Sequence, residues 1–192
     1  NKCLEKLAGP FSIIPDFVDF KNKLPKTPLQ TSNKSTPSVS ISKSSNLYQD
    51  YLHYVIYSRS ADTKPGKGNN ETIIFDKLTM SDKQNIASLT NIKNWRRMLD
   101  NNYENIDKEM PLFEKDGKPY SSVTEYLSKF KKQDITDKLI QEALLLKFTN
   151  PNNKHLLQVL LLTGNSKISL YTPRIGLTEF NNLMLVRNYL HK

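Results

Sequence analysis

The stretch ITDKLIQEALLLKFTNPNNKHLLQVLLLTGNSKISLY, residues 135–171, decides the fold class. Apolar residues recur at helical spacing from its start, and Pro151 ends this first helix because the residue before a proline is pushed out of the helical conformation. Residues 153–164 predict a second helix with Gly164 at its carboxyl end. Residues 167–171 follow as a short strand. Two helices and a strand in succession indicate a mixed α/β or α+β domain, with helices in the majority.

The sequence before this stretch predicts shorter elements. YLHYVIY at 51–57 is typical of a buried strand, and TIIF at 72–75 is typical of a second one. SDKQ at 81–84 has the capping-box pattern of a helix start, and a further helix is predicted from Asn91. FEKDGKPYSSVTEYLSKF at 113–130 predicts a strand, a turn at Asp116-Gly117, and a helix that begins at Ser121 or Ser122. The last predicted helix is capped by Thr178 and runs to the end of the chain.

Charge and cysteine content indicate which partners and which cellular compartment suit this chain. The chain has 192 residues, a formal net charge of +9 and one cysteine, Cys3. Basicity suits a polyanionic partner such as nucleic acid, although it serves solubility equally well. A single cysteine allows no internal disulfide, no apolar run is long enough to span a membrane, and no signal-peptide pattern opens the chain. We expect a reducing compartment rather than secretion.

The first 46 residues differ in composition from the rest. Residues 21–46 are dominated by Lys, Asn, Pro, Thr and Ser, with no acid, aromatic or glycine, so they cannot bury enough apolar surface to fold alone. We predict that residues 1–46 form an extended basic tail with a short apolar anchor at 10–20, and that residues 47–192 form the domain. The tail is expected to run across neighbouring chains of an assembly, with four apolar side chains in small pockets: Leu24, Leu29, Val39 and Ile41.

The stretch YSRSADTKPGKGNNE, residues 57–71, is the first candidate for a binding site. Gly66 and Gly68 would let backbone N–H groups approach an anion, and lysines beside them add positive charge. The spacing matches neither the phosphate-loop pattern nor the dinucleotide fingerprint, and an ordinary solvated loop fits it as well. Arg59 and Ser60 are better placed than the lysines to line a pocket, because they directly follow the predicted strand.

Few other residues carry a chemical signal. The three histidines are scattered and no cluster has metal-ligand spacing, so neither a metal nor another cofactor is predicted. Glu125 is a candidate general acid or base if it is buried, and a surface glutamate otherwise. Trp95 is a candidate for stacking on a purine or nicotinamide ring, and a core residue otherwise. Nucleic-acid binding is supported by charge alone, since residues 21–46 contain no aromatic side chain to stack bases.

Several stretches, in this order, resemble the NADAR-type proteins of nucleocytoplasmic large DNA viruses. They are YSRSADTKPGKGNNE, IKNWRRMLDNNY, FEKDGKPYSSVTEYLSKFKK, ALLLKFTNPNNKHLLQVLLLTGNSKISLY and LMLVRNYL, within residues 50–192. The resemblance implies a compact, mostly helical α+β fold with a small sheet. It also implies metal-independent cleavage of N-glycosidic bonds in ADP-ribosyl or related nucleotide substrates by a buried glutamate. Arg59, Ser60 and Asp62 then become candidates for a ribose-phosphate pocket, together with Trp95.

The sequence departs from the family pattern at the catalytic motif. Family members carry S-x-E-H-Y with a catalytic glutamate, whereas here Thr124 takes the glutamate's place and Glu125 the histidine's. The segment between the following lysine run and ALLLKF is also shortened. We therefore predict a degenerate domain that acts as a structural or binding component of a virus particle, located in the virion or the host cytoplasm. The alternative is an active N-glycosidase that uses Glu125, and a nucleotide or ADP-ribose ligand fits either reading.

Overall fold

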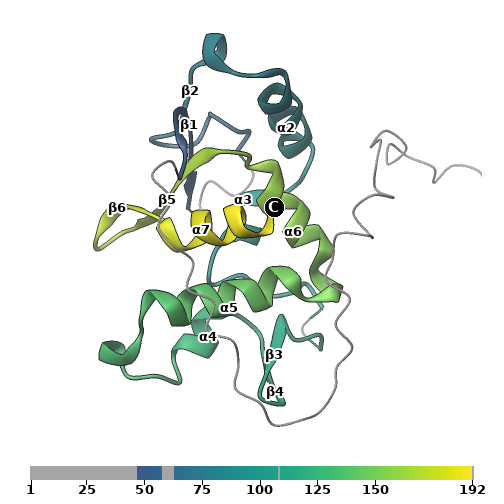
Figure 1. Cartoon of the computed structure of the whole chain (residues 1–192), viewed down its shortest axis with the longest axis vertical. Coiled ribbons are helices and arrows are strands. Elements are labelled where there is room, and N and C mark those ends of the chain that lie inside the picture. The colour runs from purple at the N-terminus through teal and green to yellow at the C-terminus, as the bar shows by residue number, and fades with distance from the viewer. Residues whose placement is uncertain (1–46, 58–62, 108, 192) are drawn as a thin grey trace, which may run out of the picture. The chain divides into compact units, whose positions relative to one another are not determined.

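Four strands form a mixed sheet in the order β2-β1-β5-β6 (Figure 1). The central pair, β1 and β5, is parallel, and each edge strand is antiparallel to its neighbour. The computed structural model describes residues 47–57, 63–107 and 109–191, and the account below concerns these residues. The strands span Gln49–Ile56 (β1), Thr72–Ile73 (β2), Ser166–Thr172 (β5) and Gly176–Glu179 (β6).

Helices pack against this sheet, with α3 against β1 and α7 against β5, and a separate two-stranded hairpin completes the fold. The α-helices span Met80–Thr90 (α2), Trp95–Leu99 (α3), Val123–Leu127 (α4), Asp137–Thr149 (α5), Lys154–Leu162 (α6) and Asn181–Leu190 (α7). The hairpin consists of β3 (Phe113–Lys115) and β4 (Lys118–Tyr120), and single 3-10 turns lie at Phe75–Lys77, Lys132–Asp134 and Pro151–Asn153. The predicted α+β class with a small sheet is confirmed.

The core lies between the sheet and the helices. Alternate residues of β1, Leu52, Tyr54 and Ile56, point into it and are at most 3% exposed. In Figure 1, α5 runs between α7 on one side and α4 with the β3–β4 hairpin on the other, and all of these elements pack against it. Leu144 on α5, Leu160 on α6 and Leu183 on α7 are fully buried. The apolar spacing of residues 135–171 therefore does produce the packed helices that the sequence predicts.

The predicted turn residues and helix-terminal residues between 116 and 164 are confirmed. The β3–β4 turn is at Asp116 and Gly117, which adopt φ angles of 52° and 71°. The Ser122 side chain accepts a hydrogen bond from the Glu125 N–H and so caps α4. Gly164, with φ of 54°, follows α6 as predicted.

Two predicted helix starts are wrong. The capping box of α2 is formed by Thr79 and Asp82 rather than by Ser81 and Gln84, since both reciprocal hydrogen bonds belong to the earlier pair. No helix begins at Asn91, which ends α2; the next helix, α3, begins only at Trp95 after Asn94 turns the chain with a positive φ of 59°.

The predicted start of the last helix is also wrong. Thr178 does not cap a helix but lies in β6, where it pairs with Leu170 of β5. The helix α7 begins at Asn181. In the described part of the chain, no helix is long and apolar enough to cross a membrane. The predicted tail and its apolar anchor at 10–20 lie outside the described residues.

Candidate functional site

The loop after β1 folds around the carboxylate of Glu71. Its Oε2 accepts hydrogen bonds from the N–H groups of Gly66 (2.9 Å) and Gly68 (3.1 Å), and its Oε1 accepts one from Val55 N–H (3.0 Å). Gly66 has a φ of 77°, and an added Cβ would lie 2.6 Å from the Ile73 side chain, so this turn requires glycine. The glycine N–H groups that the sequence suggested for a bound anion therefore bind an internal carboxylate.

Arg96 fixes this carboxylate from the other side. Its Nε donates to Glu71 Oε1 (2.8 Å) and its NH2 donates to Oε2 (2.7 Å), so the pair is bidentate. The guanidinium also donates to the carbonyl oxygens of Thr63 and Lys64, and it lies 4.3 Å from the centre of the Trp95 ring. Both charged side chains are fully buried. Arg96 thus ties α3 to the loop and to the end of β1.

A cavity of about 330 Å³ lies between this loop and the α2–α3 connection. Its wall combines the buried Leu89 and Trp95 with polar residues, including one lysine from each side. The lining residues are Thr63, Lys64, Leu89, Thr90, Asn91, Ile92, Lys93, Asn94 and Trp95. This volume is at the lower end of the range for small-molecule sites in proteins.

Trp95 belongs both to the core and to the wall of this cavity. Its side chain is 2% exposed and packs edge-on against Tyr54, with ring centres 5.2 Å apart. Its indole N–H and the Tyr54 hydroxyl have no hydrogen-bond partner in the described structure. Trp95 therefore contributes to the cavity wall as a core side chain with little surface of its own.

The other predicted pocket residues are divided between described and undescribed parts of the chain. Arg59, Ser60 and Asp62 lie outside the described residues. Thr63 and Lys64, which follow them directly, line the cavity beside Trp95. The described geometry thus brings the end of the predicted binding loop and the predicted tryptophan to one cavity.

Glu125 lies elsewhere, in the first turn of α4. Its Oε2 accepts hydrogen bonds from Ser121 N–H (2.7 Å) and Ser121 Oγ (2.8 Å), and its Oε1 lies 4.0 Å from Lys129 Nζ. These hydrogen bonds from Ser121 lower the pKa of Glu125, because they stabilise the charged form. The side chain is 39% exposed and is not part of the cavity wall. Thr124, at the position of the family's glutamate, is exposed.

Two buried basic residues, Arg187 and Lys147, were not predicted from the sequence. Arg187 is 1% exposed and donates to Thr163 Oγ1, Ser166 O and Leu47 O, which joins α7 to the α6–β5 turn and to the start of β1. Lys147 is fully buried; its Nζ donates to Asp100 O (2.7 Å) and lies over the Tyr103 ring. Burial lowers the pKa of Lys147 to about 7. Only the helical spacing of their segments, which places both on inward faces, was available to indicate burial.

The described ranges contain no group of three or more His, Cys, Asp or Glu side chains arranged to hold a metal ion. The chain matches no family model, no curated protein and no solved structure.

Proposed function

We propose that this chain is a NADAR-like domain that has lost catalysis and serves as a structural or binding component of a large DNA virus assembly. The order of its sequence motifs supports the family, and the basic tail, residues 1–46, supports attachment to other chains. The observation that carries the loss of catalysis is the position of Glu125, whose carboxylate is hydrogen-bonded to Ser121 at the start of its own helix.

A glycosidase acid needs a carboxyl group that keeps its proton near neutral pH, which requires an apolar or negatively charged surrounding that raises its pKa. Glu125 has the opposite surroundings, with two hydrogen bonds from Ser121, Lys129 nearby and partial exposure to water, and its pKa is lowered. It stays ionised at neutral pH and cannot donate a proton to a leaving base. The neighbouring Thr124 has no acidic proton to supply.

The cavity beside Trp95 supports retained ligand binding without turnover. The exposed Lys64 and Lys93 in the cavity wall suit a phosphate, and the partly exposed Ile92 beside them suits an apolar part of a ligand. Arg59, Ser60 and Asp62 immediately precede the part of the loop that lines the cavity. A nucleotide or ADP-ribose is the ligand class we propose here.

The proposal is tested with the purified full-length chain. We expect no release of nicotinamide or free base from NAD, ADP-ribose or ADP-ribosylated guanine, when the products are separated by chromatography. We expect ADP-ribose to bind measurably by calorimetry, and the double substitution Lys64→Ala/Lys93→Ala to weaken that binding about tenfold or more, since two charge-assisted contacts are lost.

Two controls make this result specific. Lys77→Ala/Lys83→Ala removes the same number of charges from exposed positions outside the cavity wall, so it should leave the affinity unchanged. Glu125→Gln removes the acid that the alternative function needs. Turnover by the unmodified chain that disappears in Glu125→Gln would replace our proposal with an active N-glycosidase.

A further inference from the structure

The outer edge of β6 is an unpaired sheet edge in the described structure. β6 pairs only with β5, and no described strand lies beyond it. The backbone alternation along β6 can be assigned, because Phe180 N–H donates to Ile168 O across the β5–β6 pair. In an antiparallel pair, the backbone N–H and C=O groups of successive residues point alternately towards and away from the neighbouring strand. The backbone groups of Thr178 and Gly176 therefore also point towards β5. The N–H and C=O groups of Leu177 and Glu179 therefore point away from the sheet.

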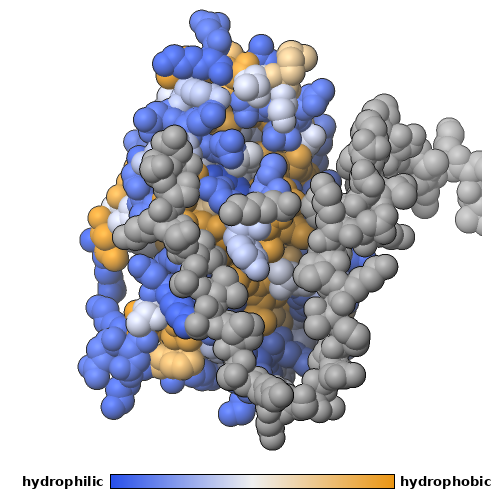
Figure 2. Space-filling view, viewed as in Figure 1, coloured by the Kyte–Doolittle hydropathy of each residue, from blue (hydrophilic) through white to orange (hydrophobic). Residues whose placement is uncertain are grey.

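β6 carries no lysine, proline or bulge, three features that often keep natural edge strands from pairing with another chain. It is a short strand, Gly-Leu-Thr-Glu, and its one charged side chain, Glu179, is paired with Lys167 of β5. Leu177 is 43% exposed, and Ile175 in the turn before it is 75% exposed. Figure 2 shows apolar atoms at the margin of the molecule where Figure 1 places β6.

The side chains beside the edge form a row that an added strand would extend. Leu177 lies opposite Tyr171 of β5, and the Tyr171 ring packs edge-on against Tyr57 with ring centres 4.8 Å apart. A further strand whose apolar residues fall at alternate positions would place them beside Leu177. The backbone groups of Leu177 and Glu179 would then hydrogen-bond to the added strand.

We infer that the outer edge of β6 accepts residues 38–42, Ser-Val-Ser-Ile-Ser, from the tail of a second copy of this chain by β-strand addition. This inference rests on the proposed role of the tail in assembly and names the surface that receives it. Val39 and Ile41 alternate with serines, which gives one apolar and one polar row at the period of a strand. Both residues are β-branched, which favours the extended conformation.

The short link to the domain favours a second copy over the same chain. Adding a strand beyond β6 in the same molecule means crossing three strand spacings from β1, about 14 Å. Residues 43–46 join this segment to Leu47, and five steps of extended chain span at most about 17 Å. Leu47 itself is held by hydrogen bonds from Arg187 and Asn188. The link would have to be nearly straight while it passes the end of the sheet, whereas a neighbouring copy meets no such limit.

The consequence is a head-to-tail contact. Each copy donates one segment and accepts another, and the two surfaces differ, so the contact generates closed rings or open filaments rather than simple twofold dimers. A structural component that is joined to its neighbours through an extended tail would assemble in this way.

The experiment measures self-association of the full-length chain by sedimentation velocity across a range of concentrations. Leu177→Pro removes an N–H that points outward, so it should block the added strand while the hydrogen bonds to β5 remain. Leu177→Thr removes the same leucine but keeps the N–H. We expect association to weaken at least tenfold in Leu177→Pro and less in Leu177→Thr, with both variants retaining the circular dichroism spectrum of the unmodified chain.

The donor segment has a matched control within the tail. Val39→Ser/Ile41→Ser should weaken association as strongly as Leu177→Pro does, whereas Leu24→Ser/Leu29→Ser removes two aliphatic side chains elsewhere and should have a smaller effect. Equal effects of the two tail variants, or no effect of Leu177→Pro, would overturn the assignment of the segment or of the edge.

Disulfide trapping separates a neighbouring copy from the same chain. In a Cys3→Ser background, one preparation carries Ile41→Cys and another carries Leu177→Cys. Oxidation of the mixture should give a linked pair containing one of each. Thr178→Cys, on the opposite face of β6, should link poorly in place of Leu177→Cys. A chain with both substitutions that closes on itself at high dilution, with no mixed pair, would overturn transfer between copies.

Failure of this inference and failure of the proposed function give different results. If deletion of residues 1–46 abolishes assembly while Leu177→Pro and Val39→Ser/Ile41→Ser do not, the tail acts at another surface and only the inference fails. A full-length chain that is monomeric at every concentration, and joins an assembly only with other viral components, also rejects the inference alone. Normal assembly without residues 1–46 rejects both.

Discussion

The charges of Glu71 and Arg96 are withdrawn from water, and each is hydrogen-bonded to the other and to backbone groups. Both side chains are fully buried, and the carboxylate also accepts hydrogen bonds from three backbone N–H groups. Removal of one partner from such a pair leaves an uncompensated buried charge. The loop between β1 and β2 depends on this pair for its conformation.

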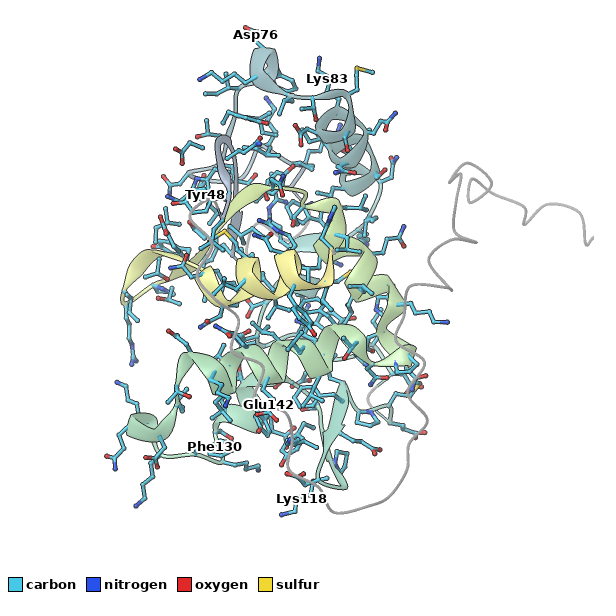
Figure 3. The ribbon with its side chains drawn as sticks, viewed as in Figure 1. Tyr48, Asp76, Lys83, Lys118, Phe130 and Glu142 are labelled. Atoms are coloured by element: carbon cyan, nitrogen blue, oxygen red, sulfur yellow. The ribbon has the colours of Figure 1, made fainter. Side chains whose placement is uncertain are left out.

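We predict that Glu71→Gln lowers the free energy of unfolding by about 3–5 kcal/mol, measured by urea denaturation. The double variant Glu71→Gln/Arg96→Gln should lose less than the sum of the single changes, because no charge is left unpaired. Lys115→Ala/Glu142→Ala breaks a partly exposed pair, whose Glu142 is labelled on α5 in Figure 3, and should cost less than about 1 kcal/mol. Similar losses at the two pairs would contradict this account.

A second prediction concerns Lys147 and the pH dependence of folding stability. Burial lowers its pKa to about 7, against 10.5 for an ordinary lysine. Between these values the unfolded chain binds a proton that the folded chain does not, so stability rises with pH through this window and falls as the pH drops towards 7. The slope from one such group approaches about 1.4 kcal/mol per pH unit.

This slope is measured by urea denaturation between about pH 7 and 8.5. Lys147→Met should remove the contribution of this lysine and flatten the curve. Lys115→Met serves as the control, since hydrogen bonding to Glu142 raises the pKa of Lys115 and moves its titration above the window. An unchanged slope in Lys147→Met would show that the buried amine does not titrate there.

At the scale of elements, the helix start of α2 illustrates how a correct pattern can be assigned to the wrong residues. Ser81–Gln84 and Thr79–Asp82 both satisfy the side-chain requirements of a capping box. Asp82 also receives a hydrogen bond from the Tyr51 hydroxyl of β1 at 3.5 Å. This contact between distant segments favours the earlier start, and no local pattern contains it.

The two possible N-caps of α2, Thr79 and Ser81, predict different effects of substitution on stability. Thr79→Ala should destabilise the domain by about 1 kcal/mol, because the Thr79 side chain accepts a hydrogen bond from Asp82 N–H. Ser81→Ala should change stability by less than about 0.5 kcal/mol, since Ser81 is exposed within the first turn of α2. Thermal unfolding of the two variants side by side gives the answer, and a larger loss in Ser81→Ala would favour the cap that the sequence suggested.

At the scale of the whole molecule, we propose that the domain and the tail have different tasks. Among the described residues, the buried core is drawn from residues 52–186, and Leu47 is held by Arg187 and Asn188. We therefore expect deletion of residues 1–46 to leave a folded domain that no longer joins its assembly. Circular dichroism and cooperative unfolding report the fold, and sedimentation reports assembly. Loss of cooperative unfolding would show that the tail is part of the domain.

The sequence alone determined the elements whose signals are local. Apolar spacing predicts the helices α5 and α6 and the strands β1 and β5. Pro151 marks the end of α5, and Asp116 and Gly117 mark the β3–β4 turn. The composition also predicts a boundary between residues 46 and 47. For the candidate site, the sequence singled out Trp95 and the loop 57–71, whose Thr63 and Lys64 line the same cavity, because tryptophan and a basic glycine-containing loop are uncommon enough to notice.

The tertiary structure decided what depends on residues far apart in the chain. It turned Leu177–Glu179 into an edge strand, since pairing with β5 satisfies the backbone groups that a helix would otherwise satisfy internally. It paired Glu71 with Arg96 across 25 positions, and it left Glu125 partly exposed beside Ser121 rather than in the cavity. Burial and pairing set the charge state of a side chain, and both arise only when distant segments pack together.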